Sequence, residues 1–160
     1  MTLLYGALSA IGALAATFML GMRYKWPVVL DLVRRMNKRV FNPRQMRSAG
    51  TPGAYAGIIH HIGRNSGRRY RTPVGVVEHD SELFIVLPYG TRPDWLKNVL
   101  RAGSAEVTHE GADYEVGDPQ LTEIRDVPEV FGTTEQTGQR LFRVERCLRL
   151  RIARQLSHQH

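Results

Sequence analysis

The chain has 160 residues, of which 42% are apolar and 23% charged. The length is typical of one domain with a modest core, and the composition excludes a disordered tail protein, a collagen and a polytopic membrane protein. One cysteine, Cys147, excludes an intrachain disulfide framework and a thiolate zinc site. The net charge of +7 lies within residues 23–47, because the rest of the chain has fourteen bases and fourteen acids. This distribution indicates a local basic surface rather than a nucleic-acid-binding domain.

Leu3 to Met22 is a run of twenty residues without a charged side chain. As a helix it would be roughly 30 Å long, which is about the hydrocarbon thickness of a bilayer. A secretory signal requires basic residues before its apolar run. None precedes this run, whereas Arg23 and Lys25 follow it. The positive-inside rule then places the following residues in the cytoplasm. We expect residues 1–22 to be a membrane anchor candidate, and a long helix in a dimer interface is the alternative.

Residues 26–41 predict a second helix, which is amphipathic and basic. Such a helix suits anionic lipid headgroups, and a helix that packs on the domain with a solvated basic face is the alternative. We therefore treat residues 23–47 as a basic helix and linker, residues 48–160 as the folded domain, and the cytoplasmic face of the cell membrane as the expected location. The expected apolar stripe consists of Val28, Val29, Leu32, Val33, Met36 and Val40.

The rest of the chain predicts a mainly β (α+β) fold, a barrel of about six antiparallel strands with one inserted helix. The helix is expected over residues 93–101, because Pro93 suits its first turn, Asp94 its N-terminal dipole and Gly103 its end. Strands joined by hairpins, without regular βαβ alternation, favour a barrel over a doubly wound sheet. Residues 127–139 stay ambiguous between a short helix and a loop. The expected strands are 54–62, 71–78, 83–87, 105–108, 113–116 with a continuation through 120–124, and 147–153.

Residues 63–73, between the first two predicted strands, are the strongest local feature of the sequence. They hold Arg64, Arg68, Arg69 and Arg71 and no acid. Glycines let backbone N–H groups approach an anion, and arginine forks suit phosphate or carboxylate oxygens. The segment therefore predicts an anionic ligand, with a solvated basic turn as the alternative. It is neither a Walker loop nor a Rossmann fingerprint.

The sequence lends little support to a metal site built from histidines or to a serine nucleophile. His60 and His61 are neighbours in a predicted strand, so their side chains should point to opposite faces and cannot easily share a metal. We therefore expect no metal site. No serine sits in a nucleophile elbow, and Cys147 adjoins an apolar strand and is expected in the core.

From about Asn42 to Ala153 the sequence resembles the deazaflavin-dependent nitroreductase family, oxidoreductases that use coenzyme F420 in a split β-barrel. The resemblance is carried by the Gly-Arg-x-Ser-Gly loop at residues 63–67, Thr72-Pro73, and a Trp-x-x-Asn helix at residues 95–98. The sequence departs from the family at Asn65, where relatives often have a basic residue. It departs again at Pro88-Tyr89-Gly90, where they often have a polar run such as Ser-Lys-Gly; Arg69 and Arg92 are the cations nearby in the sequence.

The resemblance implies which residues hold the coenzyme. The arginine loop would hold its phosphate and oligoglutamate tail, and residues 72–74 would lie along the deazaflavin ring. The loop after the third strand would present backbone groups, and the inserted helix would complete the phosphate site. The implied binding residues are Arg64, Asn65, Ser66, Gly67, Arg68, Arg71, Thr72, Pro73, Val74, Leu87, Pro88, Tyr89, Gly90, Trp95 and Asn98.

The resemblance also implies the activity, which is hydride transfer from reduced F420 to a quinone, nitroaromatic or activated-alkene acceptor. The catalytic residue is unknown, and Tyr89 and His60 are the candidate proton donors. The expected partners are the coenzyme, a lipophilic acceptor, the membrane surface and a second copy of the chain, but no nucleic acid. Two alternatives remain, a non-redox membrane-associated split barrel that binds a lipid or fatty acid, and an FMN-binding split-barrel enzyme.

Overall fold

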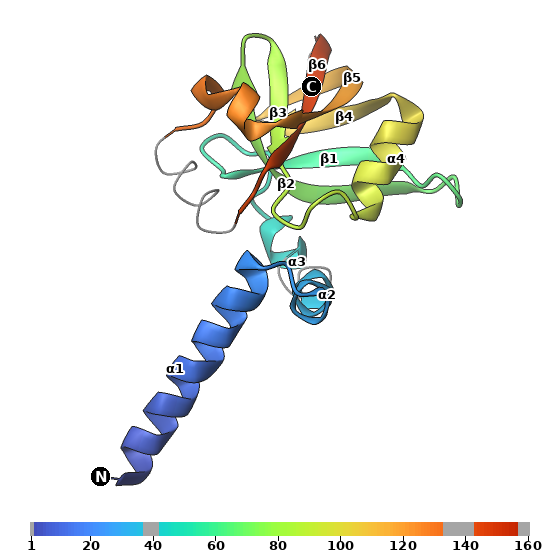
Figure 1. Ribbon diagram of the computed structural model, residues 1–160. Coiled ribbons are helices and arrows are strands. Elements are labelled where there is room, and N and C mark those ends of the chain that lie inside the picture. Colours follow the sequence, from blue (N-terminus) through green and yellow to red (C-terminus); the bar gives the residue numbers. More distant parts are fainter. Residues whose placement is uncertain (1, 37–41, 133–142, 157–160) are drawn as a thin grey trace.

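A computed structural model describes residues 2–36, 42–132 and 143–156, and it shows a closed antiparallel barrel preceded by helices (Figure 1). Neighbouring strands follow the order β1-β2-β3-β6-β5-β4, and pairing of β1 with β4 closes the barrel. This confirms the predicted split barrel of six strands with one inserted helix. The strands are β1 (Ala56–Ile62), β2 (Arg69–His79), β3 (Glu82–Val86), β4 (Ser104–His109), β5 (Ala112–Glu123) and β6 (Arg146–Leu156).

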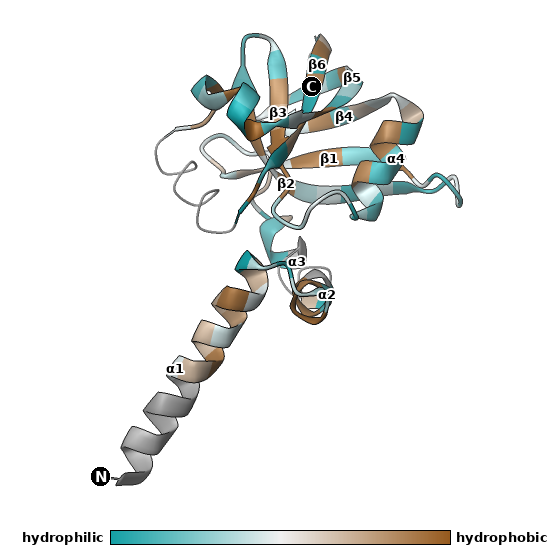
Figure 2. Ribbon diagram, in the orientation of Figure 1, coloured by the Kyte–Doolittle hydropathy of each residue, from teal (hydrophilic) through white to brown (hydrophobic). Residues whose placement is uncertain are grey.

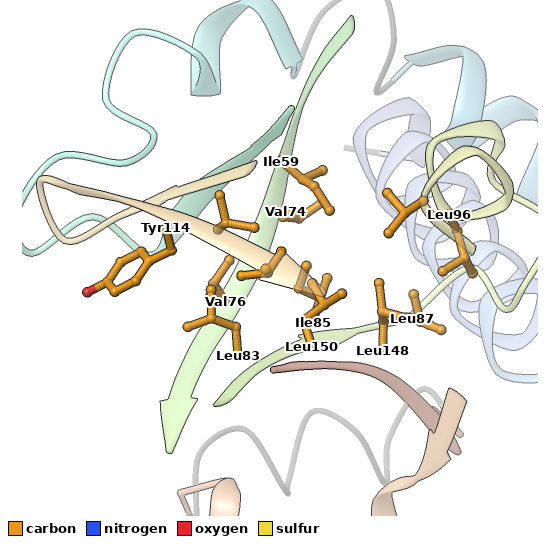
Figure 3. Close-up of a cluster of buried hydrophobic side chains, with 13 residues drawn as sticks. Ile59, Val74, Val76, Leu83, Ile85, Leu87, Leu96, Tyr114, Leu148 and Leu150 are labelled. Carbon is orange, nitrogen blue, oxygen red and sulfur yellow. The ribbon is translucent and has the colours of Figure 1, made fainter. Parts of the chain in front are cut away.

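The barrel interior is filled by apolar side chains that alternate along the strands (Figure 3). Ile59, Leu83 and Leu150 have no exposed surface. Because successive side chains of a strand point to opposite faces, the regular alternation of leucine and arginine in β6 places Leu148 and Leu150 inside and Arg149 and Arg151 outside. Burial of this kind is the main stabilising contribution to the fold.

The apolar run in β3 is continuous because both faces of this strand are covered. Leu83 and Ile85 point into the barrel, whereas Phe84 packs outside against Phe131, with ring centroids 6.4 Å apart. Cys147 belongs to the same outer cluster, as expected, and burial raises the pKa of its thiol to about 11. Short 3₁₀ turns at Ile124–Asp126 and Pro128–Val130 carry this outer cover, and residues 133–139 of the ambiguous segment lie outside the described residues.

Helix α4 (Asp94–Ala102) connects β3 to β4 and covers one end of the barrel, where its Leu96 and Val99 join the interior core. It ends as predicted, since Gly103 adopts a left-handed conformation with φ of +74° and its N–H bonds to the carbonyl of Val99. The first strand hairpin is longer than predicted. β2 begins at Arg69 rather than at residue 71, because Ile62 and His61 pair with Arg69 and Tyr70 beyond the Thr-Pro pair.

The N-terminal residues form α1 (Thr2–Arg23) and α2 (Pro27–Met36), followed by the short α3 (Asn42–Gln45). The two long helices meet closely at Gly21, where an added Cβ would lie 2.5 Å from Val29 Cγ2. Of the predicted apolar stripe of α2, Val28, Leu32 and Met36 are exposed and Val33 is buried, and Leu30, outside the stripe, is buried too. Val40 lies outside the described residues.

Apolar residues occur along α2 and along the coloured part of α1 (Figure 2), and several of their side chains are exposed. Phe18 and Trp26 are more than 40% exposed. Within the described part of the chain, no helix is both long enough and apolar enough to cross a membrane.

Leu96 tests whether α4 is part of the barrel core. Leu96→Ala removes a fully buried side chain and should lower the free energy of unfolding by about 2–5 kcal/mol. Leu100→Ala, on the exposed side of the same helix, is the matched control and should cost well under half as much. Equal losses in urea denaturation would show that α4 does not seal the barrel.

Candidate functional site

The arginine-rich segment is the hairpin between β1 and β2, and it extends from the barrel beside α4 (Figure 1). Backbone bonds from Gly63 N to the Arg68 carbonyl and from Gly67 N to the Gly63 carbonyl define its tip. Gly67 has φ of +64°, and a side chain at Gly63 would collide with Ser66 and Tyr70. The two glycines are therefore required by the turn itself.

Arg64 bonds to two residues of α4. Its Nη2 pairs with Asp94 Oδ1 at 3.0 Å, and its Nη1 donates to Asn98 Oδ1 at 3.0 Å. The backbone N–H of Arg64 donates to the same Asn98 oxygen at 3.1 Å. The hairpin is thus held against the first turns of α4 by one side chain and one backbone group.

Asn98 connects this ion pair to His61. Because Asn98 Oδ1 accepts both bonds from Arg64, its Nδ2 faces His61 Nδ1 at 3.0 Å and donates to it. His61 Nδ1 is therefore an acceptor, and the imidazole proton is on Nε2, which donates to Thr72 Oγ1 at 3.2 Å. His61 also stacks on Tyr70, with centroids 5.6 Å apart. The result is a directed chain of hydrogen bonds from Arg64 to Thr72.

His61 is buried and uncharged in this arrangement. Burial lowers its pKa, and the neighbouring His60 lowers that pKa further. A positive charge on His61 would also remove the acceptor that Asn98 Nδ2 requires. The network thus depends on a neutral imidazole.

His60 points to the opposite face of β1, as predicted. Its Nε2 lies 2.9 Å from Thr108 Oγ1, whose hydroxyl donates to Asp113 Oδ1. Burial first, and then the charge of Arg71, lower the pKa of His60. Tyr89, the other candidate proton donor, is half-buried in the loop after β3.

Three arginines of the hairpin remain exposed. Arg68, Arg69 and Arg71 form no ion pair with a described residue, in contrast to Arg64. Exposed guanidinium groups on one hairpin attract phosphate and carboxylate groups and can bind them with two hydrogen bonds each. The residues present therefore fit an anionic coenzyme tail.

The other predicted binding residues divide by burial. Asn65, Ser66 and Gly67 are exposed at the hairpin tip, whereas Thr72, Pro73 and Trp95 are half-buried. Side chains of three others point inward or into the network: Val74 and Leu87 belong to the barrel core, and Asn98 bonds to Arg64 and His61. Only the backbone of Val74 and Leu87 remains for a ligand. The loop residues Pro88, Tyr89 and Gly90 are half-buried.

A hollow of about 180 Å³ opens beside this loop. It is lined by Leu87, Gly90 and Thr91, by Lys25 from the N-terminal helices, and by Glu145 and Arg146. Sequence reasoning missed the last three residues because they come from segments far apart in the chain. It also missed the partner role of Asp94, which it interpreted only as a helix-dipole residue. No group of three or more metal-ligating side chains occurs among the described residues.

A closed antiparallel barrel with an arginine-rich hairpin held against its inserted helix defines the class, a split β-barrel. The family model of the F420H(2)-dependent quinone reductases matches residues 35–131. The chain belongs to this family. It is therefore an oxidoreductase that depends on reduced coenzyme F420.

Solved structures of low sequence identity match part of the chain. A conserved hypothetical protein from Mycobacterium tuberculosis has 13% identity over 68% of this chain and 84% of its own, with a TM-score of 0.49. An F420-H2 dependent reductase, FDR-A, has 15% identity over 60% and 93%, with a TM-score of 0.39. A Clostridium acetobutylicum protein related to general stress protein 26 has 9% identity over 74% and 87%, with a TM-score of 0.48. No curated protein sequence matches the chain.

The neutral state of His61 predicts a pH effect on stability. The unfolded chain takes up a proton near the ordinary histidine pKa of about 6.5, whereas the folded chain resists it. This stabilisation is present above about pH 6.5 and is lost as the pH falls toward the lowered folded pKa. His61→Gln keeps a donor and an acceptor but does not titrate. In urea denaturation, the free energy of unfolding of this variant relative to that of wild type should increase as the pH is lowered from 7.5 to 5.5. An unchanged difference would contradict the neutral state assigned to His61.

Proposed function

We propose that this reductase transfers reducing equivalents from F420H2 to a lipophilic quinone at the cytoplasmic face of the membrane. The observation that carries the coenzyme site is the hairpin, on which Arg68, Arg69 and Arg71 are exposed without an ion-pair partner among the described residues. The observation that supports the membrane face is the exposed apolar surface of α1 and α2.

The chain itself supplies position and charge, whereas the bound coenzyme supplies the hydride. Arg68, Arg69 and Arg71 hold the anionic tail. Arg64 holds the hairpin to α4, so that these three guanidinium groups keep a defined place relative to the loop at residues 87–91. The Thr72 hydroxyl accepts from His61, so its own hydrogen is directed to another acceptor, and we assign that acceptor to the coenzyme.

The helices before the barrel suit a membrane surface. Val28, Leu32 and Met36 form an exposed stripe on α2, and Trp26, just before this helix, has 45% of its surface exposed. Arg35 lies on the same helix and is exposed. Exposed apolar residues with adjacent cations bind the interface of anionic bilayers. This arrangement would keep the barrel close to a pool of membrane-dissolved acceptors. Association of two copies stays a prediction.

Coenzyme titration followed by tryptophan fluorescence tests the hairpin. Replacing Arg68 and Arg71 together with Ala should weaken F420 binding by roughly tenfold or more, and the difference should shrink as salt screens the exposed charges. Arg101→Ala, at the exposed end of α4, is the charge control and should bind as wild type does. FMN is the comparison ligand, and tighter binding of FMN than of F420 would contradict the proposed coenzyme.

The membrane acceptor is tested by comparing two quinones. Val28→Gln combined with Leu32→Gln should slow reduction of a menaquinone analogue embedded in anionic vesicles by several fold, because it removes apolar surface that inserts into the interface. Reduction of a water-soluble quinone by the same variant should stay unchanged. Equal rates of wild type and variant on the embedded quinone would exclude α2 as the membrane contact. Failure of wild type to reduce either quinone above background would exclude the acceptor class.

A further inference from the structure

The hollow beside the loop at residues 87–91 joins three parts of the chain. Lys25 comes from the elbow between α1 and α2, Gly90 and Thr91 from the loop after β3, and Arg146 from the first residue of β6. The loop itself has no cation at Pro88-Tyr89-Gly90. Both cations of the hollow are therefore brought by segments more than fifty residues away in sequence.

The backbone at Lys25 is unusual. The elbow ends α1 with a pair of bonds, from Trp26 N to the Gly21 carbonyl and from Lys25 N to the Met22 carbonyl. This is a Schellman ending, in which the left-handed position is normally a glycine. Lys25 occupies that position with φ of +55°. A lysine held there disfavours the elbow relative to glycine, and such strain is characteristic of functional positions.

The segment around Arg143, which contacts the elbow, also has a left-handed residue that is not glycine. Arg143 has φ of +51°, and its guanidinium carbon lies 5.5 Å from the centroid of the Tyr24 ring. This cation–π contact holds the elbow against the chain just before Glu145 and Arg146. One left-handed residue that is not glycine, Lys25, thus lines the hollow, and a second, Arg143, contacts its neighbour Tyr24.

Arg146 differs from the other arginines of β6. Arg149, Arg151 and Arg154 each pair with a carboxylate of a neighbouring strand or turn, at 2.7, 3.3 and 2.8 Å. Neither Arg146 nor Lys25 forms an ion pair with a described residue. With Glu145 as its one carboxylate, the hollow has an excess of one positive charge.

We propose that this hollow binds a singly charged phosphate group between Lys25 and Arg146, with the Thr91 hydroxyl as a further donor. The excess charge of the lining matches one negative charge, and a phosphate is small enough for the volume. The phosphate belongs either to the coenzyme, in which case the hollow holds it and the arginine hairpin holds only the tail, or to an anionic phospholipid, since both groups carry one. The inference rests on the proposed function for the first source, and it makes the N-terminal elbow part of the binding site.

Lys25→Gly separates a binding role from a structural one. Glycine suits the left-handed position, so the thermal midpoint should stay unchanged or rise by up to about 3 °C. Because the cation is lost, the affinity for F420, or for vesicles of phosphatidylglycerol, should nevertheless fall by at least fivefold. Lys25→Gln keeps the strain and removes the charge, and Arg146→Gln removes the opposite cation. Both variants should weaken the same ligand as Lys25→Gly does.

Arg101→Gln, an exposed charge change on α4 outside the proposed membrane surface, is the matched control for general attraction to vesicles. Loss of F420 affinity in the Lys25 and Arg146 variants identifies the phosphate of the coenzyme, and loss of vesicle binding beyond the control identifies a lipid. Affinities for both ligands within twofold of the control overturn the proposal. If wild type binds no F420 at all, the proposed function fails, and the hollow is judged by the vesicle measurement alone.

Discussion

The side-chain amide of Asn98 is the interaction on which the arrangement of the site depends. Its exposed fraction is only 5%, so both ends of the amide must be satisfied inside the protein. The oxygen takes two bonds from Arg64 and the nitrogen donates to His61. Three segments, the hairpin, α4 and the interior face of β1, are therefore held in one relative position. Without this bond pattern the hairpin would be held to α4 only by the exposed ion pair of Arg64 with Asp94.

Ion pairs within the structure neutralise several of the basic residues that make up the net charge. The arginines of β6 that point outward are mostly neutralised by carboxylates of neighbouring strands, as Arg149 is by Glu82 through two bonds of 2.7 Å. Arg64 is neutralised by Asp94. The cations without an ion pair among the described residues include Arg68, Arg69 and Arg71 on the hairpin and Lys25 and Arg146 at the hollow.

Much of the fold could be predicted, because the relevant signals are local. Alternation in β6, a continuous apolar run in β3 and the Pro93 and Gly103 ends of α4 each depend on residues close together in sequence. The burial of the apolar stripe of α2 could not be predicted in the same way. Helical spacing identifies which residues share a face, but the contact of Gly21 with Val29 decided how the helix is turned, and that contact depends on the packing of two helices.

The sequence by itself determined the barrel, the inserted helix, the arginine-rich hairpin and the opposite directions of His60 and His61, since periodicity and turn residues are properties of short segments. Only the tertiary structure decided which arginines are available to a ligand. Arg64 and Arg68 look equivalent in the sequence, yet Arg64 meets Asp94 thirty residues away while Arg68 stays exposed. The placement of Lys25 and Arg146 in one hollow likewise could not be predicted from the sequence. Charge partners are set by distances in space, and a linear sequence carries no direct record of them.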